Sequence, residues 1–215
     1  MLLLDGDYQW LGESNYLWIL DPGHGGVNDA GHYMTAPAKM HKFPQFTIYE
    51  GVINRAITEL VKKQLMAMRI DYAIVAHPIE DTPLSLRVSR ADAVYAKDKR
   101  AVYLSIHSNA GKGSGFEIFT SPGQGKSDKI ANIFCSVYQK QFPLFLMRFD
   151  LSDGDADKEA DFYVLRKTDC PALLVENLFF DNLHEAEYLM SAEGQQKIAD
   201  CIVMAIKKVE HIKPI

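Results

Sequence analysis

The stretch Trp18-Ile19-Leu20-Asp21-Pro22-Gly23-His24-Gly25-Gly26 combines a buried strand with a presented histidine. The apolar run from Leu17 to Leu20 predicts the strand, and Asp-Pro-Gly ends it because proline cannot continue a sheet ladder. The flanking glycines allow a sharp turn that leaves the imidazole of His24 uncovered. In an open α/β sheet, a side chain just past the carboxyl end of a strand lies where ligands bind. A glycine-rich turn with an incidental histidine fits this stretch equally well.

Length and composition indicate one globular domain. The chain has 215 residues, of which 47% are hydrophobic and 24% are charged, enough to bury a substantial core. The net charge of -5 and the lack of a basic stripe argue against a nucleic-acid partner. No run approaches the roughly 20 apolar residues of a membrane span. The three dispersed cysteines (Cys135, Cys170 and Cys201) are expected to be reduced and buried.

Strand-like and helix-like segments alternate along the chain, which predicts an α/β fold. We expect a single domain, with its core over about 17–207, built on a twisted, mostly parallel sheet of about six strands with helices on both faces. The expected strands are 17–20, 71–76, 101–106, 116–120, 162–165 and 172–175, and the expected helices are 51–68, 84–97, about 127–141 and about 184–209. A small strand pair over 1–16 with a turn at Asp5-Gly6, a long loop over 25–49 and a mobile acidic loop over 150–161 complete the prediction.

Ionisable side chains follow two further buried strands. His107 comes directly after the strand 101–106, and Glu176 comes directly after the strand 172–175. Glu50 precedes the predicted helix 51–68, which has the clearest apolar face in the chain. Two histidines and a carboxylate are a known ligand set for catalytic zinc, with the fourth position left to water, and a second carboxylate can then move a proton. The residues alone also permit a hydrogen-bonded core histidine at 107, a helix-capping carboxylate at 176 and a carboxylate at 50 that only complements the helix dipole.

Several stretches resemble the zinc-dependent N-acetylmuramoyl-L-alanine amidases of the Amidase_3 type, in the same order along the chain. They are Leu20 to Gly26, Glu50 with Asn54, Leu84-Ser85-Leu86-Arg87 with Ala91, Ser105-Ile106-His107-Ser108-Asn109-Ala110, Tyr163 to Arg166, and Pro171 to Phe179 with Asn182. The resemblance extends over about 17–207, nearly the whole chain. It implies one zinc ion held by His24, Glu50 and His107, with Glu176 as the catalytic acid and base. Asn109, in the fourth of these stretches, is predicted to contact substrate.

The implied reaction is hydrolysis of the amide between the lactyl group of N-acetylmuramic acid and L-alanine of the stem peptide in peptidoglycan. The sequence departs from the family pattern in four places. The loop 25–49 is longer than expected, Asp92 replaces a usual asparagine, a Thr-Arg pair is replaced around Ala76-His77, and Asn177-Leu178 replaces the glycine that usually follows the catalytic glutamate. None of these changes removes a predicted metal ligand. We also expect the loop 25–49 to contact the stem peptide.

Two other functions remain open. A zinc carboxypeptidase-like enzyme that trims the stem peptide would use the same residue types, whereas a non-catalytic peptidoglycan-binding module would be favoured only if a ligand or Glu176 were missing. We expect action on the bacterial cell wall, in the periplasm or outside the cell. No signal peptide is recognisable in Met1-Leu2-Leu3-Leu4, which an acidic segment follows. The lack of a recognisable signal peptide is compatible both with a phage-type lysin and with a trimmed form of an exported enzyme. The oligomeric state is not predicted.

Overall fold

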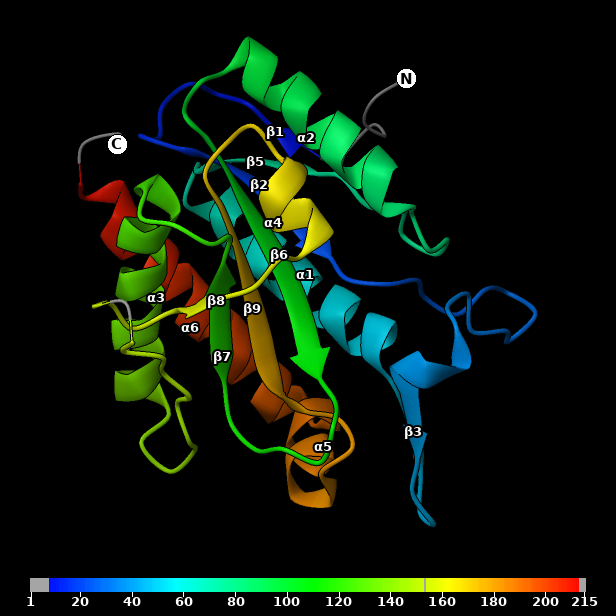
Figure 1. The fold of residues 1–215 in the computed structure, drawn as a ribbon. Coiled ribbons are helices and arrows are strands. Elements are labelled where there is room, and N and C mark those ends of the chain that lie inside the picture. Colours follow the sequence, from blue (N-terminus) through cyan, green and yellow to red (C-terminus); the bar gives the residue numbers. More distant parts are fainter. Residues whose placement is uncertain (1–7, 153, 213–215) are drawn as a thin grey trace.

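A central sheet with helices on both of its faces organises the molecule (Figure 1). In the computed structural model, which describes residues 8–152 and 154–212, the sheet has seven strands in the order β1-β5-β2-β6-β9-β7-β8. They are β1 (Tyr8–Gln9), β2 (Leu17–Pro22), β5 (Asp71–Ile74), β6 (Ala101–Asn109), β7 (Glu117–Thr120), β8 (Lys158–Glu159) and β9 (Ala172–Phe179). The four central strands are parallel, while β1 and β7 run antiparallel to their neighbours β5 and β9.

Six α-helices in the described residues cover the two faces. They are α1 (Glu50–Ala67), α2 (Leu84–Lys97), α3 (Lys126–Gln141), α4 (Tyr163–Lys167), α5 (Leu183–Met190) and α6 (Ala192–Glu210). Alternate residues of β2 enter different cores: Trp18 and Leu20 pack in the cluster of α1, α3 and α6, whereas Leu17 and Ile19 pack in the cluster of α2 and α4. A sheet covered on both faces needs nearly continuous apolar strands, which is the pattern of the sequence.

The predicted α/β class, the mostly parallel sheet and its two helical layers are confirmed. The sheet has seven strands rather than about six, because the two-residue strands β1 and β8 extend its edges whereas the expected strand 162–165 is a helix. The cysteines are free and buried, as expected. In the described part of the chain, no helix combines the length and the apolarity needed to cross a membrane.

Other local predictions were wrong. Residues 162–165 were expected as a strand, but Tyr163–Lys167 forms α4. Val164 and Leu165 are both buried between exposed neighbours; adjacent residues can share one side of a helical turn, whereas strand residues alternate. The expected helix 184–209 is two helices, because Ser191 ends α5 and caps α6 by accepting a hydrogen bond from the Gly194 amide.

The segments expected as loops also contain regular structure. Residues 25–49 include a short 3₁₀ turn, Pro37–Lys39, and a hairpin of β3 (Met40–Lys42) and β4 (Thr47–Tyr49) that leads into α1. The acidic segment 150–161 contains β8. The first part of the predicted strand pair over 1–16, including its turn at Asp5-Gly6, lies outside the described residues. Tyr8–Gln9 pairs with β5.

Parallel pairing brings the ends of distant strands together. Pro22, the last residue of β2, is opposite Ile106 of β6, and His107 is opposite Glu176 of β9. The strands β2 and β9 extend two and four residues beyond the predicted ends, through Asp21-Pro22 and Glu176 to Phe179. One edge of the sheet therefore collects three of the four predicted ionisable residues, and α1 supplies the fourth.

Candidate metal centre and active site

His24 lies in the turn that leaves β2, in a conformation that few residues other than glycine adopt. Its φ of 64° is in the left-handed region. Non-glycine residues with such a φ are uncommon and are enriched at functional sites. The carbonyl oxygen of His24 accepts a hydrogen bond from Arg87 Nη2 at 3.0 Å, which fixes this turn. A side chain on the preceding Gly23 would begin 2.2 Å from the His107 ring, so glycine is needed there for the two histidines to approach.

Glu50 is the first residue of α1 and is only 1% exposed. A carboxylate at this position is stabilised by the helix dipole. The start of α1 packs closely against the turn after β2, since a Cβ at Gly51 would lie 2.0 Å from the carbonyl oxygen of Gly25. This close approach brings the carboxylate of Glu50 toward His24 and His107.

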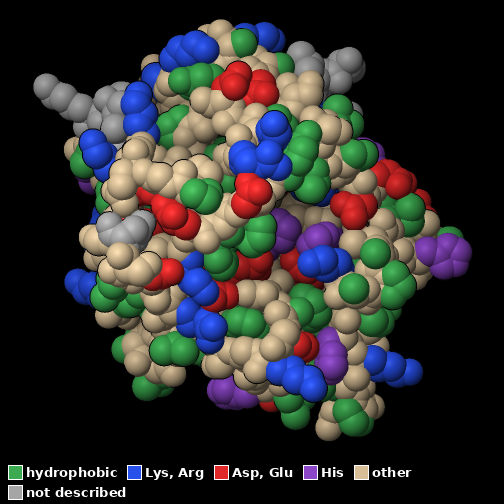
Figure 2. Space-filling model, viewed as in Figure 1, with side chains coloured by type: hydrophobic (Ala, Val, Ile, Leu, Met, Phe, Trp, Pro, Cys, Tyr) green, Lys and Arg blue, Asp and Glu red, His purple; other side chains and the backbone are tan. Residues whose placement is uncertain are grey.

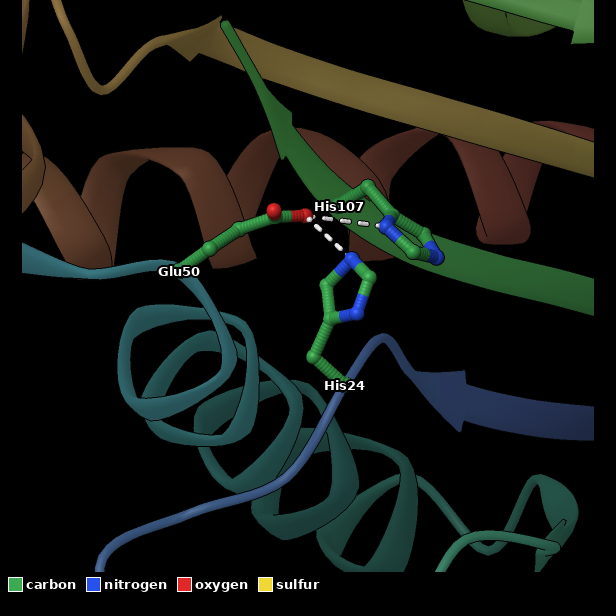
Figure 3. Close-up of side chains that lie close together, drawn as sticks. All are labelled: His24, Glu50 and His107. Atoms are coloured by element: carbon green, nitrogen blue, oxygen red, sulfur yellow. Dashed lines mark hydrogen bonds and ion pairs between the residues drawn. The ribbon is translucent and has the colours of Figure 1, made fainter. Parts of the chain in front are cut away.

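The side chains of His24, Glu50 and His107, here called the triad, point toward one another (Figure 3). Nδ1 of His107 lies 3.0 Å and Nε2 of His24 lies 3.1 Å from the same oxygen, Oε1 of Glu50. The two imidazole rings are perpendicular, with centroids 5.0 Å apart. One donor atom from each residue lies within 4.8 Å of the other two, so the triad could hold a metal ion.

The hydrogen bonding of the triad also fits a metal site. Nε2 of His24 and Oε2 of Glu50 are buried without a hydrogen-bond partner among the described residues. Burial lowers the pKa of His24 despite the nearby Glu50, which favours the neutral imidazole that metals need. Burial opposes ionisation of Glu50, but its interactions with His107 and His24 prevail and lower its pKa to about 2. The triad therefore offers two imidazole nitrogen donors and one anionic oxygen donor.

Glu176 lies beside the triad, on β9 opposite His107. One of its carboxylate oxygens, Oε2, is buried and unpartnered within the described structure. Burial raises the pKa of Glu176 well above its usual value, and the negative charge of Glu50 raises it further. A carboxyl group in such an environment holds a proton more readily than an exposed glutamate does, which suits a group that transfers protons.

A bulge follows Glu176 where the sequence lacks the expected glycine. Between the pairs His107–Glu176 and Asn109–Phe179, β9 contains one more residue than β6. Leu178 occupies this bulge with a φ of 62° and a fully buried side chain. Glycine would adopt that backbone conformation without strain, whereas leucine incurs about 1–2 kcal/mol. The leucine side chain offsets this strain by packing in the core.

A second, fully paired carboxylate lies next to Glu176, and sequence reasoning missed it. Glu117 of β7 is opposite Glu176 in the sheet. Its Oε1 accepts hydrogen bonds from Arg148 at 2.8 Å and Lys158 at 2.6 Å, and its Oε2 accepts one from Asn109 at 2.5 Å. Burial alone would raise the pKa of Glu117, but these two cations lower it, so Glu117 stays ionised. No local motif indicates this group, because β7 and β9 pair across a long connection.

Asn109, predicted to contact substrate, is at the end of β6 and half-buried. Its amide nitrogen donates to Glu117 and its amide oxygen accepts from the Ala110 backbone at 2.7 Å. The structure thus places Asn109 at the edge of the site, and its role remains a prediction.

Lys39, which sequence reasoning also missed, comes from the loop 25–49 and has its ammonium 3.9 Å from Oε2 of Glu50. Figure 2 shows histidine and acidic side chains in a hollow bordered by lysine and arginine side chains.

Comparison with known proteins gives a consistent family match. The profile of the N-acetylmuramoyl-L-alanine amidase family matches residues 19–208. An N-acetylmuramoyl-L-alanine amidase, CwlM of Bacillus licheniformis, is 33% identical over 183 residues, which are 84% of this chain and 63% of that protein. The endolysin of Bacillus phage SPP1 is 27% identical over 93% of this chain and 68% of its own length. The chain thus spans less than two thirds of the CwlM sequence.

Solved structures share the same fold. The crystal structure of an N-acetylmuramoyl-L-alanine amidase from Clostridium difficile 630 superimposes with a TM-score of 0.73. The match covers 90% of this chain and 95% of the other chain, at 23% sequence identity. The likeness therefore extends over nine tenths of this chain.

Proposed function

We propose that this chain, which belongs to the N-acetylmuramoyl-L-alanine amidase family, is a zinc-dependent peptidoglycan hydrolase. The bond cleaved is the amide between the lactyl group of N-acetylmuramic acid and L-alanine of the stem peptide. The observation that carries this proposal is the triad of two histidines and a glutamate with Glu176 directly beside it.

Zinc is the metal that best suits the triad. Imidazole nitrogen and carboxylate oxygen are both common zinc ligands, and three protein ligands with an open fourth position are typical of catalytic sites. Magnesium and calcium prefer sites made of oxygen atoms only. When bound, zinc supplies Lewis-acid activation of water and of the scissile carbonyl group. His24, Glu50 and His107 would hold it.

Glu176 is the proposed general base and acid. Its carboxylate would accept a proton from the attacking water and deliver that proton to the departing amine of L-alanine, which is a poor leaving group unless protonated. Its neighbour Glu117 is paired with Arg148 and Lys158 and has no freedom to share this task. The two adjacent carboxylates therefore have different protonation behaviour, which is how acid and base roles are separated in many active sites.

The substrate implies a setting at the bacterial cell wall. One relative is a phage endolysin and another is a bacterial amidase. The loop 25–49 brings the Lys39 ammonium to 3.9 Å from Oε2 of Glu50 in the triad, so we propose that this loop contacts the stem peptide. Shortening this loop should change the relative rates on peptidoglycans of different stem peptides while zinc content stays constant; identical rates on all of them would exclude the contact.

Analysis of the products tests the proposed reaction. Purified peptidoglycan is digested with the zinc-loaded protein and the fragments are identified by mass spectrometry. An amidase releases stem peptides with a free amino group on L-alanine and leaves glycan without peptide. Release of carboxyl-terminal amino acids alone would instead show a carboxypeptidase, and binding without any cleavage would show a non-catalytic module.

The ligand assignment is tested with His107→Ala. Removal of one imidazole leaves two protein ligands, so the protein should lose most of its zinc affinity and its activity. Zinc content is measured by elemental analysis after dialysis, with His211→Ala as a control distant in sequence, near the end of α6. Stoichiometric zinc in His107→Ala would remove this residue from the ligand set, and active wild-type protein free of transition metal would exclude zinc.

A further inference from the structure

Three aspartates outside the triad converge near the amino end of α3. Asp128 belongs to the first turn of α3, whereas Asp155 and Asp157 belong to the segment that precedes β8. One carboxylate oxygen from each residue lies within 4.8 Å of the other two. This aspartate cluster is far in sequence from the triad and plays no part in the proposed hydrolysis.

The cluster contains buried carboxylate oxygens that lack partners. Asp157 is only 1% exposed; its Oδ2 accepts a 2.7 Å hydrogen bond from the Thr120 hydroxyl, and its Oδ1 is buried with no partner among the described residues. Oδ1 of Asp155 is also buried and unpartnered there. Buried carboxylates normally pair with a cation or accept several hydrogen bonds, because their desolvation is costly.

No side-chain cation neutralises the cluster. Within residues 8–152 and 154–212, no lysine, arginine or histidine lies within 4.0 Å of the three carboxylates; the ion pairs formed by this part of the chain involve other residues. Burial raises the pKa of Asp157 to about 7 against the effect of the Thr120 hydrogen bond, and the charges of Asp155 and Asp128 raise it further. Lys126 and Lys129 line the adjoining cavity but lie beyond ion-pair distance of the three carboxylates. The fold thus concentrates negative charge at a place where no described side-chain cation pairs with it.

We propose that the aspartate cluster binds a calcium ion. Its donors are all oxygen atoms, which hard divalent cations prefer. Calcium takes six to eight oxygens at about 2.3–2.6 Å, so two oxygens on opposite sides of the ion are about 5 Å apart, a spacing compatible with the cluster. Magnesium usually binds through one or two carboxylates and keeps several waters, which fits three converging carboxylates less well. A surface cavity of about 410 Å³, lined partly by Asp128, Asp155, Gln124 and Asn132, gives access and room for further oxygen ligands.

Calcium at this site would anchor the segment that leads into β8. Lys158 directly follows Asp157, and its ammonium donates the 2.6 Å hydrogen bond to Glu117 that lies beside Glu176. The ion would connect this segment to the start of α3 and to Thr120 at the end of β7. The expected result is a more stable protein, because an ion that binds only the folded state raises its stability by mass action.

Thermal unfolding of the zinc-loaded protein with added CaCl2 tests the proposal, together with calcium titration calorimetry. At about 100 times the Kd, the Tm of the wild type should rise by about 5–10 °C. Asp157→Asn keeps the shape and the Thr120 hydrogen bond but removes one charge. It should show no calcium-dependent rise, and without calcium its Tm should be no lower than that of the wild type, because the substitution relieves repulsion. Asp150→Asn, an exposed aspartate of the same acidic segment, is the matched control and should keep the full rise.

Several outcomes would overturn the calcium site. They are the absence of a Tm rise or binding heat in the wild type, an undiminished rise in Asp157→Asn, and an equal loss in Asp150→Asn. An equal or larger rise with MgCl2 would overturn the assignment to calcium. If Asp157→Asn does not fold, Asp155→Asn is used in its place, since that side chain is only half-buried. Asp128 is unsuitable for this test because it also accepts a hydrogen bond from the Gly125 amide at the start of α3.

Discussion

Two buried charged groups lie at the same edge of the sheet and differ in how fully they are paired. The first is Asp21 with Arg87. Asp21 is 1% exposed and accepts hydrogen bonds from Arg87, Tyr103 and Ser105. The Arg87 guanidinium also donates to the carbonyl oxygens of Thr82, Pro22 and His24. Neither side chain has a buried, unpartnered atom in the described structure.

The second group is the triad with Glu176. It is equally close to the carboxyl ends of the strands, but Nε2 of His24 and one carboxylate oxygen each of Glu50 and Glu176 are buried without a hydrogen bond among the described residues. A buried group whose atoms are all paired serves the fold, whereas one with free donor atoms is suited to a ligand. The two groups are linked, because Arg87 holds the carbonyl oxygen of His24. The paired group thus supports the backbone from which His24 projects.

Replacing the proposed base should have the largest effect. Glu176→Gln keeps the shape of the side chain but cannot accept a proton, so the hydrolysis rate should fall by roughly 10²–10⁴, or about 3–5 kcal/mol of transition-state stabilisation. Zinc content and Tm should remain close to the wild-type values. Turnover on peptidoglycan is measured beside Glu187→Gln, an exposed control on α5. Loss of zinc would make Glu176 a ligand and call the assignment of Glu50 into question, and near-normal turnover would assign the proton transfer to another group.

Breaking the paired group should reduce stability instead. Asp21→Asn leaves the buried guanidinium of Arg87 without its main counter-charge, and removing one partner of a buried ion pair typically costs about 3–5 kcal/mol. The free energy of unfolding is measured with denaturant. Asp81→Asn is the matched control, because Asp81 also faces Arg87, at 3.4 Å, but its side chain is 35% exposed; its loss should be under about 1 kcal/mol. Equal losses in the two variants would contradict the importance assigned to burial.

The stability difference between the wild type and Asp21→Asn should depend on pH. Burial opposes ionisation of Asp21, but the charge of Arg87 and the hydrogen bond from Tyr103 prevail and hold its pKa below the usual value. A carboxylate with a lowered pKa stabilises the fold above its unfolded-state pKa of about 3.9, and this contribution is lost as the pH falls below that value. The difference should therefore be smaller at about pH 3 than at pH 7. A difference that is constant or larger in acid would show that Asp21 is not held in its ionised form.

The smallest effect should come from the loop that borders the triad. The Tyr33 hydroxyl donates to the carbonyl oxygen of Lys39 at 3.1 Å and accepts from the Gly51 amide at 3.0 Å. Tyr33→Phe should lower the free energy of unfolding by about 1 kcal/mol, the typical net value of a hydrogen bond, or somewhat more for the unpaired Gly51 amide. Tyr49→Phe is the control, because Tyr49 packs on Tyr33 with ring centroids 4.7 Å apart and its hydroxyl forms no hydrogen bond within the described residues. An equal loss in the two variants would show that the hydrogen bonds of the Tyr33 hydroxyl do not hold this loop.

Much of the candidate site could be predicted because its residues follow recognisable elements. His24 and His107 each follow an apolar strand, and Glu50 begins a clearly amphipathic helix. Parallel strands end at the same edge of a sheet, so the convergence of the triad needed only the fold class. Glu176 was predicted at the same edge, although β9 continues past it to Phe179.

The remainder depends on contacts between segments that no local pattern connects. Glu117 acquires its place beside Glu176 because β7 pairs antiparallel with β9, and its cations come from Arg148 and Lys158, more than 30 residues away in sequence. The aspartate cluster likewise requires the segment before β8 to return to the start of α3. A charged residue in a sequence reveals its type but not its partner.

The sequence by itself determined the α/β class and the helices α1 and α2, because hydrophobic periodicity is a local property. It also placed His24, His107 and Glu176 at strand ends and Glu50 at a helix start, and their chemical roles stay predictions. Only the tertiary structure decided which of the buried charges are fully paired and which keep free donor atoms. It also decided that Leu178 takes a left-handed bulge in β9 and that Val164 and Leu165 belong to a helix. These outcomes depend on strand register and on packing between distant segments, where the free energy of burial outweighs local backbone preference.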